Sequence, residues 1–135
     1  MEVRSVHHVA LAVEDLEQAV DTYSSLFGAE VELRGRIEDE GVEAVYLRIG
    51  GGRLELVSPL RPDTSVGRFL ERRGPGLHHV AFEVADVGAT AEELSARGAT
   101  VIEPGLRRGL GGHDVAFVHP ESLQGVLAEV VSSRG

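Results

Sequence analysis

The sequence predicts an α+β fold made of two copies of one strand–helix–three-strand (βαβββ) module. The stretch His-His-Val-Ala-Leu-Ala-Val at residues 7–13 recurs as His-His-Val-Ala-Phe-Glu-Val at residues 78–84. The offset between the second histidines is 79 − 8 = 71 residues. After each stretch comes an aspartate, then a segment with helical spacing that ends in Gly-Ala-x-Val. An internal repeat of this kind indicates a duplicated structural unit.

One domain is expected over residues 1–135, because this length suits a single core shared by two small modules. The first module spans about residues 4–60 and the second about residues 76–133. A linker with one short helix, at about residues 61–75, joins them. Two such modules can bury their helix-packed faces and close their concave faces around a small molecule.

Alternation in the first strand of each module assigns its two faces. Side chains of a strand point alternately to opposite faces, so the bulky aliphatic residues of 7–13 share one face, and His8 shares the other with two alanines. His79 shares its face with an alanine in the same way. We expect the bulky face to pack on a helix and the histidine face to form the floor of a site. His7 and His78 point to the opposite face and are predicted to be structural.

The remaining elements follow from capping residues and spacing. Asp15 and Asp86 are suitable N-caps, and a glycine is placed to end each of the two helices that follow. Helices are expected over residues 15–27, 65–73 and 86–97. Further strands are expected near residues 30–36, 42–49 and 53–58, and then near 99–104, 114–119 and 126–132.

Composition excludes several classes of function. The formal charge of −9 disfavours nucleic acid as a partner, and no run approaches the roughly eighteen apolar residues that span a bilayer. The first residues lack the apolar segment of a signal peptide. With no cysteine, the chain has no disulfide and no thiolate metal ligand. We therefore expect a cytoplasmic enzyme or binding protein.

Each module also carries one glutamate inside an apolar strand, Glu55 in the first and Glu129 in the second. They follow the module histidines by similar separations, 55 − 8 = 47 and 129 − 79 = 50 residues. A lone histidine in a strand is commonly structural and a lone glutamate commonly faces water, but the repeat supplies both types twice. Two imidazoles and two carboxylates suit a divalent ion such as Zn, Co, Mn, Ni or Fe. An unpaired glutamate in an apolar strand would otherwise be costly.

Taken together, these motifs resemble the vicinal oxygen chelate superfamily (glyoxalase, bleomycin resistance and dioxygenase proteins), and within it the methylmalonyl-CoA epimerases. The resemblance covers nearly the whole chain, and the order and spacing of its motifs are specific. Besides the two repeated stretches, it is carried by residues 54–56 with 59–60, 65–70, 76–77, 117–120 and 125–129.

The resemblance implies a vicinal oxygen chelate fold and a divalent ion, with Co, Zn, Mn and Ni as the candidates. It implies epimerisation of (2R)- and (2S)-methylmalonyl-CoA by removal of the α-proton through a metal-stabilised enolate, with Glu129 as one acid–base residue. Some members have glutamine in place of Glu55. The implied metal ligands are His8, Glu55, His79 and Glu129.

The second acid–base residue departs from the family pattern. Several members carry Gly-Val-x-Glu-Ala, whereas this chain reads Gly-Val-Glu-Ala-Val at residues 41–45. Glu43 therefore comes one residue early, and Ala44 occupies the family position. In a regular strand this slip moves the carboxylate to the other face, unless a bulge beside Gly41 returns it. Glu43 is either the second catalytic residue or an exposed surface charge.

Two other functions remain open. A glyoxalase-type isomerase or a lyase would use the same metal ligands with a different pocket, and a metal-free small-molecule-binding module would use the fold without them. The expected partners are an acyl-CoA substrate and a second copy of the chain in a homodimer, with no nucleic acid and no membrane. By the resemblance, Arg107 and Arg108 meet the anionic end of coenzyme A; as ordinary surface residues they would be solvated.

Overall fold

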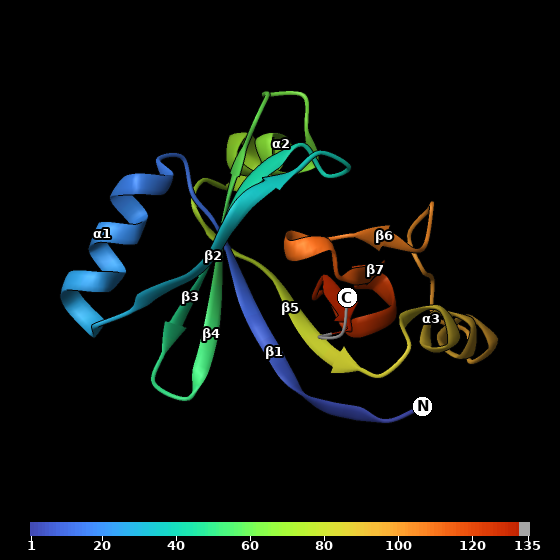
Figure 1. The fold of residues 1–135 in the computed structure, drawn as a ribbon. Coiled ribbons are helices and arrows are strands. Elements are labelled where there is room, and N and C mark those ends of the chain that lie inside the picture. The colour runs from blue at the N-terminus through green and yellow to red at the C-terminus, as the bar shows by residue number, and fades with distance from the viewer. Residues whose placement is uncertain (133–135) are drawn as a thin grey trace. The chain divides into compact units, whose positions relative to one another are not determined.

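The computed structural model describes residues 1–132, so Ser133, the last residue assigned to the second module, lies outside it. The described chain divides into two compact units. One unit is His8–His78, and the other combines Met1–His7 with the chain from His79 onward. The boundaries fall inside the strands Val3–Ala12 and Gly76–Val84, and apart from these two strands each unit holds the elements of one βαβββ module, as the repeat predicts (Figure 1).

The first module forms a four-stranded arrangement in the order β2-β3-β4-β1. β1 pairs in parallel with β4, whereas β2–β3 and β3–β4 are antiparallel. The linker helix α2 follows the last strand. The bounds are β1 (Val3–Ala12), α1 (Leu16–Phe27), β2 (Glu30–Ile37), β3 (Val42–Ile49), β4 (Gly52–Pro59) and α2 (Ser65–Arg73).

Helix α1 covers the bulky face of these strands (Figure 1). Its N-cap Asp15 accepts a hydrogen bond from the Gln18 N–H at 3.0 Å, and Gly28 ends it in the left-handed conformation that favours glycine. Leu16 packs with Leu47 and Leu56, which are completely buried, and Leu11 and Val13 of the first repeat stretch join this core. The face predicted to pack on a helix therefore does so.

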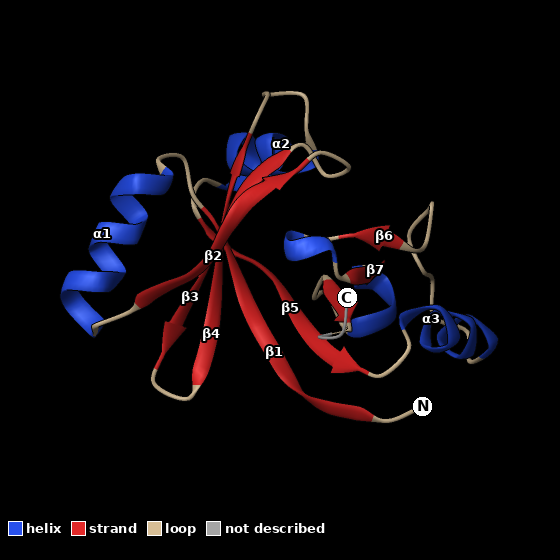
Figure 2. Ribbon diagram, in the orientation of Figure 1, coloured by secondary structure: helices blue, strands red, loops and turns tan. Residues whose placement is uncertain are grey.

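The second module repeats the arrangement with strand order β5-β8-β7-β6. β5 pairs in parallel with β8, and the other pairs are antiparallel. Helix α3, drawn in blue in Figure 2, is capped by Asp86 and packs on β7 and β8. Its Val87 shares a buried core with Val84 at the end of β5 and Val130 of β8. The bounds are β5 (Gly76–Val84), α3 (Val87–Ala96), β6 (Arg107–Arg108), β7 (Asp114–Val118) and β8 (Ala128–Val131).

The strand predicted over residues 99–104 is wrong. This segment makes only an isolated bridge between Val101 and Val118, and the first strand after helix α3 is instead the two-residue β6. Pro104 has no N–H to donate to a ladder, and the Gly105 N–H donates to the Ile102 carbonyl at 2.9 Å, which turns the chain away. Pairing with β7 resumes only at β6. Among the described residues, no helix is long and apolar enough to cross a membrane.

Candidate metal and acid–base site

The first module brings His8 and Glu55 together. In the parallel pairing of β1 with β4, Glu55 stands opposite Ala10, two residues along the strand from His8, so both side chains point to the same face. His8 is 1% exposed and Glu55 is 4% exposed. The His8 Nε2 atom lies 3.4 Å from Oε1 of Glu55. His8 and Glu55 therefore form one buried pair on the face that the sequence assigns to His8.

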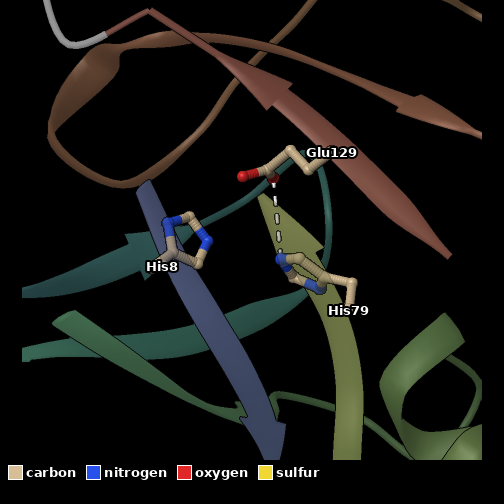
Figure 3. Close-up of side chains that lie close together, drawn as sticks. All are labelled: His8, His79 and Glu129. Atoms are coloured by element: carbon tan, nitrogen blue, oxygen red, sulfur yellow. Dashed lines mark ion pairs between the residues drawn. The ribbon is translucent and has the colours of Figure 1, made fainter. Parts of the chain in front are cut away.

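The second module brings His79 and Glu129 together by the same register. Glu129 of β8 stands opposite Ala81 of β5, two residues along from His79. His79 is 5% exposed and Glu129 is 4% exposed. Figure 3 shows the two side chains pointing toward one another, with Nε2 of His79 at 3.9 Å from Oε2 of Glu129. Each module therefore holds one buried imidazole–carboxylate pair.

The donor chemistry of both pairs fits a divalent ion. Their N···O distances of 3.4 and 3.9 Å exceed the roughly 2.7–3.2 Å of an ordinary hydrogen bond. Two ligand atoms about 2.1 Å from one ion are separated by about 3.0 Å at octahedral angles and about 3.4 Å at tetrahedral angles. The first pair has this spacing, and the second is slightly wider. Imidazole and carboxylate together suit borderline divalent ions.

An aromatic residue packs against each of the two histidines, and sequence reasoning missed both. Tyr46 stands opposite Glu55 in the β3–β4 pairing, and Phe117 stands opposite Glu129 in the β7–β8 pairing. The ring centroids of His8 and Tyr46 are 5.2 Å apart, as are those of His79 and Phe117. The register between antiparallel strands is needed to find these contacts. The sequence does show one aromatic residue in the strand before each glutamate, Tyr46 before Glu55 and Phe117 before Glu129.

Glu43, predicted as the second catalytic residue, lies on the side of β3 that faces helix α1. The pairing of β3 with β4 is regular from Val42 to Ile49, without the bulge that would turn Glu43 around. Arg34 donates from Nε to Glu43 at 3.4 Å and also bonds Glu17 of α1, which lowers the pKa of the Glu17 carboxyl. Ala44, at the family position, is completely buried. The catalytic role of Glu43 stays a prediction.

The other histidines have separate surroundings. His78 packs edge-on against Phe69 of α2, with centroids 5.0 Å apart, and burial lowers the pKa of its imidazole, against an opposing effect of the Glu55 charge. His119 caps the turn that follows it, since its Nδ1 accepts the Glu121 N–H at 3.0 Å. Arg107 and Arg108, predicted to meet coenzyme A, form strand β6.

Comparison with known proteins agrees with this architecture. Residues 7–117 match the model of the Glyoxalase/Bleomycin resistance protein/Dioxygenase superfamily. The chain is 35% identical over 127 residues to the ethylmalonyl-CoA/methylmalonyl-CoA epimerase of Cereibacter sphaeroides, covering 93% of this chain and 95% of the relative. It is 32% identical over 126 residues to the human mitochondrial methylmalonyl-CoA epimerase, covering 93% and 72%.

Among solved structures, a variant of the Streptomyces coelicolor methylmalonyl-CoA epimerase in complex with 2-nitronate-propionyl-CoA is similar over 99% of this chain and 100% of that chain, with a TM-score of 0.94 and 36% identity. The family match, these relatives and the paired βαβββ modules confirm the resemblance read from the sequence. The chain belongs to the glyoxalase/bleomycin resistance protein/dioxygenase superfamily, the vicinal oxygen chelate fold, and its relatives there include methylmalonyl-CoA epimerases.

Proposed function

We propose that this chain is a metal-dependent epimerase that interconverts (2R)- and (2S)-methylmalonyl-CoA. The observation that carries the reaction class is the buried imidazole–carboxylate pair that recurs in both modules. The substrate is supported by relatives named as methylmalonyl-CoA epimerases, which align with more than nine-tenths of the chain. One solved relative also binds an acyl-CoA, 2-nitronate-propionyl-CoA.

In this proposal the two pairs bind one divalent ion together. The ligands are His8 and Glu55 from the first module and His79 and Glu129 from the second. Cobalt, zinc, manganese and nickel all suit two nitrogen and two carboxylate ligands. When bound, the ion supplies Lewis-acid stabilisation of the negative charge that develops on the thioester oxygen as the α-proton leaves. The duplicated sequence likewise predicts that the two histidines and two glutamates bind one ion.

The carboxylate of Glu129 accepts the α-proton on one face of the substrate and returns it in the reverse reaction. Glu129 is 4% exposed and lies on the ligand face of β8. Epimerisation needs a second group on the opposite face. The sequence suggests Glu43 for this role, whereas the regular pairing of β3 holds its carboxylate beside Arg34 on the α1 side of the strand, so the role is tested by Glu43→Gln.

The activity is tested by α-proton exchange of methylmalonyl-CoA in deuterated water, followed by proton NMR with and without a chelator. Metal-dependent exchange with inversion is expected. Exchange without inversion would show one working base, and no exchange in metal-loaded protein would exclude this substrate. A glyoxalase-type isomerase or a lyase on the same ligands is then tested with their own substrates.

The metal ligands are tested by His79→Ala, with His119→Ala as the matched control. Loss of His79 is expected to abolish both metal retention and turnover, because it removes one of two nitrogen ligands. Loss of His119 removes a turn cap and is expected to leave metal content unchanged. Full activity of the His79 variant with no bound metal would refute the mechanism.

We also propose that the enzyme acts in the cytoplasm as a homodimer. The absence of cysteine from the sequence is compatible with a reducing compartment. Light scattering coupled to size-exclusion chromatography measures the mass in solution, and a monomer at micromolar concentration would refute the dimer. Fractionation of the source cells tests the compartment.

A further inference from the structure

In each module a histidine, an aromatic residue and an arginine lie one against the next, and we call these three residues the stack of that module. Tyr46 packs on His8 with an interplanar angle of 51°, and Phe117 packs on His79 at 89°. Each aromatic residue stands directly opposite the glutamate of its own module. Cross-strand partners point to the same face of a sheet. The aromatic ring is therefore built into the ligand face and is not a separate part of the core.

An arginine completes each stack. The Cζ atom of Arg53 lies 5.5 Å from the Tyr46 ring centroid, and that of Arg107 lies 5.5 Å from the Phe117 ring centroid. A guanidinium over an aromatic ring within about 6 Å is attracted by the ring quadrupole. The same distance occurs in both modules, although Arg53 lies on β4, the last strand of its module, and Arg107 lies on β6, the first strand after the helix of its module.

Both guanidinium groups are themselves anchored. Arg53 donates from Nε and Nη2 to the carboxylate of Glu32 at 2.7 and 3.3 Å, a forked contact in which the Arg53 side chain is 20% exposed. Arg107 donates from Nη2 to the Glu103 carbonyl oxygen at 2.8 Å. An anchored cation holds the ring beneath it, and a held ring limits the rotation of the imidazole packed against it.

We propose that Arg53 and Arg107 are positioning residues that act through Tyr46 and Phe117 to orient the two metal-binding histidines. The inference rests on the proposed divalent-ion site and names the residues that prepare its nitrogen ligands. The second side-chain torsion of histidine is intrinsically broad, so an unsupported ring must be ordered when the ion binds. Groups around the ligands of a metal site commonly contribute tenfold to hundredfold in affinity.

The test compares Arg53→Gln with Arg48→Gln. Arg48 also approaches Glu32, at 3.7 Å, but its side chain is 50% exposed, compared with 20% for Arg53. Affinity for Co²⁺ is measured by calorimetry and by the visible absorption of the bound ion. We expect about tenfold weaker binding for Arg53→Gln and unchanged binding for Arg48→Gln. Equal affinity in both variants would overturn the proposal.

The second module offers the same comparison. Arg107→Gln is expected to weaken Co²⁺ binding about tenfold. The side chain of Arg108 is 66% exposed and pairs with Asp114. Arg108→Gln is therefore expected to leave the Co²⁺ affinity unchanged. Weaker Co²⁺ binding in only one of the variants Arg53→Gln and Arg107→Gln would overturn the claim that the arginine positions the histidine in both modules.

Action through the ring is tested by a double-mutant cycle. In a Tyr46→Leu background, Arg53→Gln should cause no further loss of Co²⁺ affinity, whereas additive losses would show that the arginine acts by another route. Tyr46→Phe keeps the ring and should bind Co²⁺ as the wild type does. If Tyr46→Phe binds as weakly as Tyr46→Leu, the hydroxyl and not the ring is responsible, and the proposal fails.

A readout in the metal-free protein separates this inference from the proposed function. The ring protons of His8 should shift in the proton NMR spectrum of Tyr46→Leu, because the aromatic ring current is lost, and should shift and broaden in Arg53→Gln. Failure of the wild type to bind Co²⁺ would refute the metal site. Unchanged His8 signals in Arg53→Gln would refute the positioning role even if the wild type binds the ion.

Discussion

One substitution made at two equivalent positions separates metal binding from proton transfer. Glu55 and Glu129 are both 4% exposed, each lies on the ligand face of its module, and each faces a histidine Nε2, at 3.4 and 3.9 Å. Glutamine has nearly the same volume and keeps one carbonyl oxygen, but it cannot accept the α-proton. If both residues only bind the ion, Glu55→Gln and Glu129→Gln should have equal effects.

We expect the effects to differ strongly. Removing a general base typically costs about a hundredfold to ten-thousandfold in rate, which corresponds to about 2.7–5.4 kcal/mol of transition-state stabilisation. Glu129→Gln should lose this amount in kcat. Glu55→Gln should lose less than about tenfold, or about 1.4 kcal/mol, once the ion is saturating, because an amide oxygen remains as a ligand.

The assay is α-proton exchange in deuterated water at saturating Co²⁺, with metal content measured for each variant. Thermal unfolding of both variants checks that the fold is retained. Equal falls in kcat for the two variants, at equal metal content, would refute the assignment of Glu129 as the proton acceptor. Near wild-type exchange in Glu129→Gln would do the same.

Three further predictions follow from the first module. The regular pairing of β3 predicts that Glu43→Gln leaves kcat unchanged in the exchange assay, whereas a large fall would establish the catalytic role suggested by the sequence. Leu47→Ala, at a completely buried position in the α1 core, should lower the free energy of unfolding by about 2–5 kcal/mol in urea; a loss below about 1 kcal/mol would contradict this packing. The bond from Arg34 lowers the pKa of Glu17, so this contact stabilises the fold above the unfolded-state pKa and is lost as pH falls through the folded value. Carbon-detected NMR titration should show the Glu17 pKa return toward its ordinary value in Arg34→Gln, and an unchanged pKa would exclude the contact.

Much of the candidate site follows from local pattern alone. The period of two in a strand assigns His8 and His79 to the face opposite the bulky residues, and this depends only on backbone geometry. An isolated charge in an apolar strand, as at Glu55 and Glu129, is costly enough to indicate a site before any contact is known. Duplication then indicates that both pairs serve the same purpose.

Contacts between segments far apart in the chain depended on the tertiary structure. Whether Tyr46 lies beside His8, and which arginine covers its ring, depends on the register of β3 on β4, which the turn at residues 50–51 sets. The surroundings of Glu43 likewise depended on helix α1, which brings Glu17 to Arg34. The failed strand prediction at residues 99–104 has a local origin instead, since β7 bridges the segment at Val101 but Pro104 has no N–H with which to continue the ladder.

The sequence by itself thus determined the fold class, the duplicated modules and the four ligand candidates, because these depend on periodicity and on the cost of burying charge. Only the tertiary structure decided which face Glu43 occupies and which side chains support each histidine. A one-residue change in register reverses the face of every side chain in a strand, and register is set by packing over the whole module.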